Sequence, residues 1–267
     1  DTEGHNAGMY PLARHAEILA YYDKVMREKL LASGRVRYHP LTEYRGRDET
    51  GAHRLRGILS GAESSVTTRR KLVVATWFQT SVPATHTPAF AIAPGTSLAI
   101  PGDLPNLWRA GAEQPQHFVI LGGGKTAMDT AVWLIEAGVA PERIEWVRPR
   151  DSWMFNRRML QPAHVALEQL VEFQLALVEC ADAAANGRAM CALLEERGVM
   201  LRIDPEVEPT MFHYAVISEG EIALMRQITR VHRQGRVTAI APKALHFGET
   251  EVAVPQDTMF IDCTATA

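Results

Sequence analysis

Three consecutive glycines lie between an apolar run and a stretch of helix-forming residues, in the sequence VILGGGKTAMD. Gly122, Gly124 and Ala127 match the spacing G-x-G-x-x-G/A, with Gly123 inside the turn. The first glycine allows a tight turn, the second lets the backbone approach a pyrophosphate, and a small third residue lets helix and strand pack closely. A helix N-terminus also offers free N–H groups and partial positive charge to a phosphate. The pattern predicts dinucleotide binding, and the alternative is an ordinary tight turn.

Four side chains near this turn could add contacts to a nucleotide. Lys125 and Thr126 lie where the helix begins, and there they either reach a phosphate oxygen or form an exposed pair. Arg148 and Arg150 lie at the end of the following strand. An acid at that place accepts the ribose 2′-OH of NAD, whereas an arginine accommodates the 2′-phosphate of NADP. We therefore predict a preference for NADP(H) through Arg148, helped by Arg150; the alternative is that either arginine is a solvated surface charge.

The elements that must position these residues follow from the apolar pattern. Phe118–Leu121 is a continuous apolar run, typical of a strand that is covered on both faces in a parallel sheet. Apolar residues at helical spacing predict a helix over Thr126–Ala137, and Gly138 is placed to end it. Residues 144–147 supply the next strand. We therefore expect a strand–turn–helix–strand unit, the context that the glycine pattern requires.

The rest of the chain divides into segments of different character. Apolar residues at helical spacing predict a helix over 13–32. A short apolar strand is expected over 72–75. Residues 79–106 are rich in proline and lack periodicity, which is typical of a long ordered linker. Residues 162–197 are expected to be mostly helical, with an interruption at 185–187.

Composition excludes several classes of protein. With 267 residues and 46% hydrophobic content, the chain can hold a large core. Its net charge of −3 gives no reason to expect binding to nucleic acid, and no apolar run approaches membrane-spanning length. The three cysteines form no C-x-x-C pair, and the histidines share no ligand spacing, so no metal site is expected. A reducing cytoplasm is the expected setting.

Four segments together resemble a known class of enzymes: EILAYYDKVMREKLLASGRVRYHP, RRKLVVATWFQTSVPATHTPAF, VILGGGKTAMDTAVWLIEAGV and FIDCTATA. The chain resembles FAD/NAD(P)-binding oxidoreductases, the two-dinucleotide flavoproteins that include flavin-containing monooxygenases. The resemblance implies an α/β fold in which a Rossmann-type NAD(P)-binding domain is inserted in a partial FAD/NAD(P)-binding domain. The implied boundaries are 1–108 for the partial FAD-type domain with its linker, 109–229 for the NAD(P)H domain and 230–267 for the return strands.

The resemblance also implies where FAD would lie. Ala75-Thr76 and Thr264-Ala265 occupy the places of the two A-T-G-like crossings between domains, so Thr76 and Thr264 are the expected flavin contacts. Neither crossing has glycine in the third place, because Trp77 and Thr266 stand there. The alternative is that both pairs are buried strand ends that do not touch a flavin.

The resemblance implies hydride transfer from NADPH to FAD and on to oxygen or another acceptor. The alternative is a stand-alone dinucleotide-binding module without catalysis. The class begins with its own glycine motif for FAD, and nothing before residue 13 matches it, since Gly4 and Gly8 lack a strand–turn–helix context. We therefore expect a fragment that does not retain FAD by itself. No catalytic side chain, substrate or oligomeric state follows from the sequence.

Overall fold

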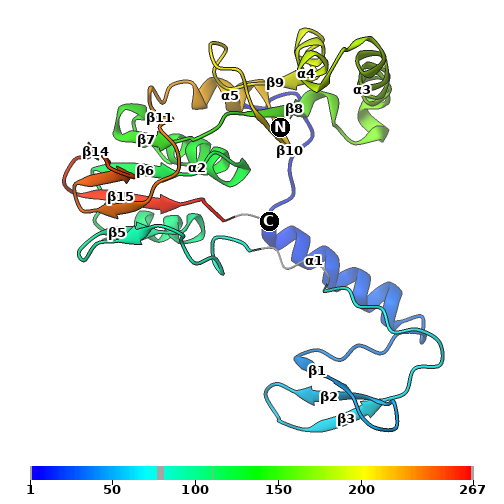
Figure 1. The fold of residues 1–267 in the computed structure, drawn as a ribbon. Coiled ribbons are helices and arrows are strands. Elements are labelled where there is room, and N and C mark those ends of the chain that lie inside the picture. Colours follow the sequence, from blue (N-terminus) through cyan, green and yellow to red (C-terminus); the bar gives the residue numbers. More distant parts are fainter. Residues whose placement is uncertain (1, 77–80, 110, 266–267) are drawn as a thin grey trace. The chain divides into compact units, whose positions relative to one another are not determined.

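The computed structural model describes residues 2–76, 81–109 and 111–265 (Figure 1). The chain separates into two compact units. The smaller unit is Leu12–Gln79, and the larger combines Asp1–Pro11 with Thr80–Ala267. No helix among the described residues is long and apolar enough to cross a membrane.

The smaller unit contains a helix followed by a small antiparallel sheet. Helix α1, His15–Val25, continues as a π-helical turn over Met26–Leu31, close to the helix expected over 13–32. The sheet has the order β1-β2-β3, formed by Thr42–Arg47, His53–Gly57 and Glu63–Val66.

The strand expected over 72–75 was wrong. Those residues form no strand, and Val73 is 81% exposed. An apolar run becomes a strand only when a neighbouring strand satisfies its backbone groups, and β3 already ends at Val66. The pair Ala75-Thr76 is therefore exposed and is not a buried strand end.

A five-stranded parallel sheet forms the centre of the larger unit. Its order is β11-β7-β6-β15-β5, with strands Arg230–His232, Ile144–Val147, His117–Leu121, Thr258–Asp262 and Ser97–Ala99. Every residue of β6 is buried, as its continuous apolar run predicted. Ile120 is the partner of Trp146 on one side and of Ile261 on the other. A mixed α/β fold with a parallel sheet is thus confirmed.

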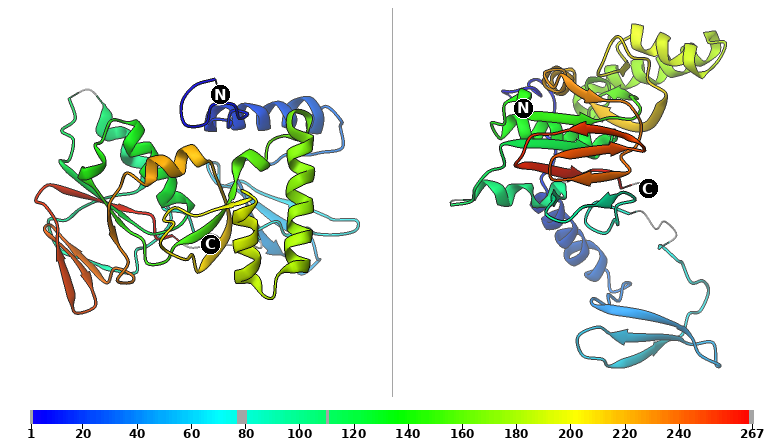
Figure 2. Two further views of the ribbon diagram at one scale, coloured as in Figure 1. Left: turned by 90° about the horizontal axis from the view of Figure 1, so that it is seen from above. Right: turned by 60° about the vertical axis from the view of Figure 1, so that its left-hand side comes forward.

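Different layers cover the two faces of this sheet (Figure 2). Phe118 and Ile120 belong to a core that includes residues of α2 (Lys125–Glu136), α5 (Glu219–Met225) and the 3-10 helix Pro101–Trp108. Val119 and Leu121 instead pack against a second sheet, β14-β13-β12-β4. The strands of that sheet are Thr250–Ala253, Ala244–Phe247, Ala239–Ala241 and Ala91–Ile92. Alternate residues of one buried strand therefore serve two separate cores.

A helical segment is inserted between β7 and β11. It contains the sheet β10-β8-β9, formed by Met211–Ile217, Ser152–Asn156 and Met200–Leu201. Helices α3, Ala163–Ala183, and α4, Gly187–Glu196, pack on it, and the break between them lies within one residue of the expected interruption at 185–187. Two short 3-10 turns, Pro141–Arg143 and Arg157–Met159, complete the unit. One side of α3 leaves apolar side chains exposed, among them Leu175 and Val178.

The sheet order bears on the expected domain boundaries. Strands β11 and β15 both come after residue 229, yet they pair with β7 and β6 in the sheet that carries the glycine turn. A boundary after residue 229 would therefore run through one sheet. In this structure β11 and β15 complete that sheet, because β15 lies between β6 and β5. Insertion into a partial FAD-type domain remains a prediction.

Candidate functional site

The glycine turn joins β6 to the N-terminus of α2, the context that the sequence predicted. Gly122 has φ +124°, and a Cβ atom there would lie 2.6 Å from the carbonyl oxygen of Cys263. Its N–H donates to the carbonyl of Val147 at 3.0 Å. This position therefore excludes any side chain, both through its backbone conformation and through lack of space.

The next two glycines differ in their surroundings. A Cβ at Gly123 would lie 2.9 Å from the carbonyl oxygen of Arg150, so the turn and the loop after β7 are in close contact. A Cβ at Gly124 would meet nothing within 4 Å. Gly124 is the N-cap of α2, and it has no side chain with which to cap the first-turn N–H groups. The space beside it and the uncapped helix start are suited to an anion.

The first turn of α2 carries both residues that sequence analysis singled out there. Lys125 forms an ion pair with Asp129 one helical turn away. Thr126 is exposed, and Ala127 is fully buried. The small third residue of the motif therefore lies at the helix–sheet contact, while the lysine has an internal partner and remains partly exposed.

The two arginines after β7 lie in different environments. Arg148 is 2% exposed, and its Nε lies 3.0 Å from Oδ1 of Asp151. The two atoms are poorly aligned, so the contact is an ion pair without a good hydrogen bond. Burial lowers the pKa of Arg148 to about 10, and Asp151 acts in the opposite direction, so the guanidinium stays charged at neutral pH. Arg150, in contrast, is exposed.

The end of β15 lies beside the glycine turn. The N–H of Cys263 donates to the carbonyl of Leu121 at 2.9 Å. The carboxylate of Asp262 accepts hydrogen bonds from the N–H and the hydroxyl of Thr264, at 2.9 and 2.6 Å. Burial raises the pKa of the Cys263 thiol to about 12, as expected of a core thiol. Thr264 thus shares the carboxyl edge of the sheet with the glycines.

The structure brings together most of the predicted site residues. The glycines, Lys125, Thr126 and Ala127 meet the end of β7 and the end of β15 at one edge of the sheet. Thr76 belongs to the smaller unit, and Trp77 and Thr266 lie outside the described residues. Ligands of open parallel sheets bind outside the carboxyl ends of the strands, where the strand order reverses. That reversal falls between β6 and β15, beside the glycine turn.

The contacts that hold this edge in place were not predicted from the sequence. The indole Nε1 of Trp146 donates to the carbonyl of Gly122 at 2.7 Å. Asp151 pairs with Arg233 as well as Arg148, at 3.0 Å in each case. Asp151 follows Arg148 by three residues in the sequence, and this spacing could have indicated an ion pair between them. The Trp146 contact depends on strand register, which the local sequence does not reveal.

A charged network is buried further along the same strands. Glu145 is 4% exposed and accepts hydrogen bonds from His117, His232 and Arg230, at 3.1, 2.7 and 3.1 Å. Burial alone would raise the pKa of Glu145, but the hydrogen bonds from these three donors lower it well below its ordinary range. The network links β6, β7 and β11 across the sheet.

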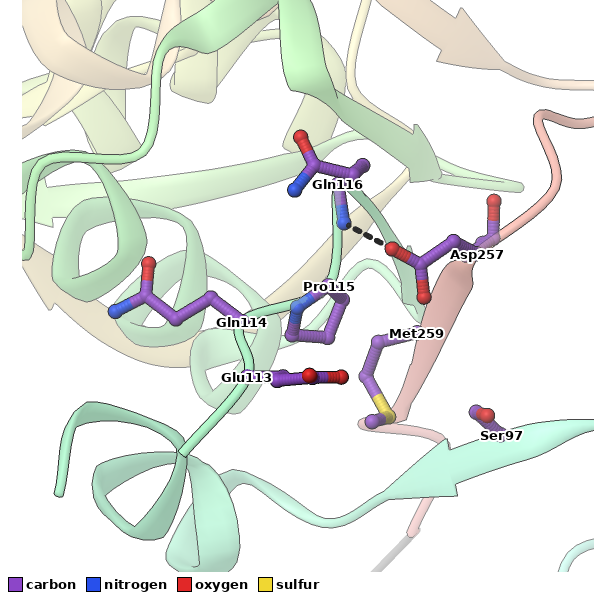
Figure 3. A pocket seen from close by; sticks show the side chains of 8 residues that line it. Ser97, Glu113, Gln114, Pro115, Gln116, Asp257 and Met259 are labelled. Carbon is purple, nitrogen blue, oxygen red and sulfur yellow. Dashed lines mark hydrogen bonds between the residues drawn. The ribbon is translucent and has the colours of Figure 1, made fainter. Parts of the chain in front are cut away.

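An open pocket of about 450 Å³ lies at the opposite edge of the sheet (Figure 3). It is found where β6 and β15 begin, and there the N–H of Gln116 donates to Asp257 at 3.0 Å. Glu113 also lines it. Two carboxylates disfavour a phosphate ligand, so this pocket does not compete with the glycine turn as a nucleotide site. Across the part of the chain that the structure describes, no cluster of side chains could hold a metal ion.

Comparisons with known proteins give relatives but no established activity. No protein-family model matches the chain. Uncharacterized proteins of Mycobacterium bovis and Mycobacterium tuberculosis are 36% identical to it over 265 residues, which is 99% of this chain and 47% of theirs. The chain thus spans about half the length of the curated relatives it matches.

One solved structure is also similar, the L-lysine 6-monooxygenase from Pseudomonas syringae. The match covers 96% of this chain and 59% of that chain, with 15% sequence identity and a TM-score of 0.41. This TM-score is too low to establish a shared fold.

Proposed function

We propose that this chain binds NADPH at the carboxyl edge of its parallel sheet, as the nicotinamide-binding part of a flavin-dependent oxidoreductase. The observation that supports this most directly is the turn at Gly122–Gly124. Its first two glycines have no space for a side chain, while the third leaves open space before an uncapped helix. A pyrophosphate placed there would accept hydrogen bonds from backbone N–H groups and lie at the positive end of the α2 dipole.

We assign the 2′-phosphate contact to Arg150. The sequence favoured Arg148, but that guanidinium is buried and neutralised by Asp151. Arg150 is exposed in the loop after β7, and its carbonyl lies close to the glycine turn. This supports a role in binding the 2′-phosphate, because an arginine after the second strand of such a unit accommodates that group. Arg148 then has a structural role. Lys125 could leave Asp129 for a phosphate oxygen, because an exposed ion pair of this kind contributes little.

NADPH, when bound, supplies a hydride, and in the class that the sequence resembles the acceptor is FAD. FAD fits the described residues less well. Only one turn in the sequence has the G-x-G-x-x-G/A pattern, and we assign it to NADPH. Thr264 is occupied by its own hydrogen bonds to Asp262, and Thr76 is exposed without a surrounding strand. We therefore propose that this chain alone does not retain FAD stoichiometrically.

Titration calorimetry with NADPH and NADH tests the nucleotide assignment. We expect NADPH to bind more tightly, and Arg150→Ala to weaken NADPH binding about tenfold while leaving NADH binding unchanged. Arg188→Ala is a matched control, because Arg188 is an exposed arginine on α4 that pairs with Glu208, away from the glycine turn. Equal affinities in the wild type would refute the preference for NADPH. Absence of binding for both nucleotides would refute the site itself.

Flavin content separates the oxidoreductase from the alternative, a stand-alone dinucleotide-binding module. If the chain is part of a flavoprotein, we expect the purified chain to be colourless, and adding FAD at high concentration should allow measurable NADPH oxidation. A stand-alone module would bind NADPH and show no oxidation at any FAD concentration. A yellow sample with near-equimolar flavin would contradict our assignment of FAD.

A further inference from the structure

The indole of Trp146 lies directly beneath the glycine turn. Trp146 is in the middle of β7 and is fully buried. Its Nε1–H donates to the carbonyl oxygen of Gly122 at 2.7 Å, a short and favourable N–H···O contact. The carbonyl of the first glycine is therefore held toward the interior of the sheet.

Because the peptide bond is planar, this hydrogen bond also fixes the direction of the following N–H group. In a trans peptide the C=O and the following N–H point in opposite directions. Because Trp146 holds the Gly122 carbonyl inward, the N–H of Gly123 must point outward, away from the buried indole. A rotation of this one peptide would replace that outward donor with a carbonyl oxygen, which would repel a phosphate. Glycines permit such rotations more readily than other residues.

Neighbouring contacts hold the Trp146 ring itself. The guanidinium of Arg148 lies 4.8 Å from the centre of that ring, and Asp151 pairs with the guanidinium. The Cγ of Arg148 would lie 3.2 Å from a Cβ at Gly123, so the arginine also supports the turn from below. On the other side, the Cys263 carbonyl limits movement of Gly122.

We propose that Trp146 is a positioning residue for the pyrophosphate: its indole N–H keeps the Gly122–Gly123 peptide in the orientation that presents an N–H to the ligand. This inference rests on the proposed function. A neutral hydrogen bond of this kind contributes a net effect that corresponds to about a three- to tenfold change in an equilibrium constant. The effect should appear only with ligands that carry the pyrophosphate.

Two probes separate positioning from general structural support. NADP⁺ contains the pyrophosphate, whereas adenosine 2′-monophosphate keeps the adenosine and the 2′-phosphate but lacks it. We expect Trp146→Phe to weaken NADP⁺ binding about three- to tenfold and to leave binding of adenosine 2′-monophosphate unchanged. Both affinities are measured by calorimetry, the weaker one through competition.

Trp108→Phe is the matched control. The indole of Trp108 donates to the carbonyl of Ala137 at 3.0 Å, the same type of bond at the other end of α2. Its loss should lower stability without changing either affinity. If Trp146→Phe does not fold, the isosteric benzothienyl analogue of tryptophan at this position removes the N–H while keeping the ring's volume, and the same selective loss is expected.

Three outcomes would overturn the inference. They are an unchanged affinity for NADP⁺, an equal loss for both ligands, and the same selective loss in Trp108→Phe. Failure of the proposed function is recognised separately, because the wild-type chain would then bind neither NADP⁺ nor adenosine 2′-monophosphate, and both proposals would fall together.

Discussion

Replacing Glu145 by glutamine removes a buried negative charge that three donors share. The carboxylate accepts from His117 and His232, both largely buried, and from Arg230, whose side chain is 54% exposed. Glutamine offers one oxygen, so at least one histidine loses its acceptor, and the new amide N–H₂ faces donors. Hydrogen bonds to a charged group are worth about 1.5–3 kcal/mol each, while the exposed arginine adds little. We expect Glu145→Gln to lower the free energy of unfolding by about 2–3 kcal/mol.

The loss of unfolding free energy in Glu145→Gln should become smaller as the pH falls. The folded-state pKa of Glu145 is depressed, because the hydrogen bonds from the histidines and Arg230 outweigh its burial. Such a group stabilises the folded state above its unfolded pKa of about 4.3, and this stabilisation disappears as pH falls toward the folded pKa. The difference in unfolding free energy between wild type and variant should therefore have its full size at about pH 6–7 and be smaller at about pH 3–4.

Urea unfolding followed by tryptophan fluorescence measures this difference. Trp108, Trp133, Trp146 and Trp153 all belong to the larger unit, which contains Glu145. A control is Glu251→Gln, since Glu251 is exposed and lies 3.9 Å from a histidine; its cost should stay under about 0.5 kcal/mol. The reasoning fails if Glu145→Gln costs no more than this control, or if its cost does not shrink on acidification.

Three further predictions follow from packing and exposure. Gly122→Ala should lower the free energy of unfolding by about 2–4 kcal/mol and NADPH affinity by at least about tenfold, because of backbone strain and the Cys263 carbonyl. Gly124→Ala should fold normally, and melting curves and NADPH titration compare the two variants. Iodoacetamide should modify Cys191 before Cys263 in the folded protein, because Cys263 is buried and its burial raises the thiol pKa to about 12. Peptide mass spectrometry follows the order of modification, and the reverse order would contradict this. Val178→Lys, on the exposed side of α3, should change the unfolding free energy measured by urea unfolding by less than about 0.5 kcal/mol; a large destabilisation would mean that this face is covered.

The local parts of the site could be predicted from sequence. A glycine turn, the helix after it and the strand before it lie within about 20 residues, and each has its own signal in spacing and composition. Strand β6 was recognisable because both of its faces are buried, which makes the apolar run continuous. The start of α2 differed from the expected residue by one position.

The non-local parts could not be predicted. Whether an apolar run becomes a strand depends on a partner. Residues 72–75 have none within the described part of the chain, whereas Thr258–Asp262 lie between β6 and β5. Burial of Arg148 depends on Asp151 and on the ring of Trp146 in the preceding strand, which together allow a charge at the sheet's edge to be enclosed. Spacing alone could not show which arginine of the pair would be buried and which exposed.

The position of β15 also has a consequence for synthesis of the chain. Ile120 and Ile261 are partners, so one edge of β6 has no neighbour until the ribosome has made nearly the whole of this sequence. During that interval β6, apolar on both faces, presents unpaired backbone groups of the kind that promote aggregation. Non-local pairing of this type is also slow to form. Low expression temperature or a chaperone that binds extended apolar segments should therefore raise the yield of folded protein.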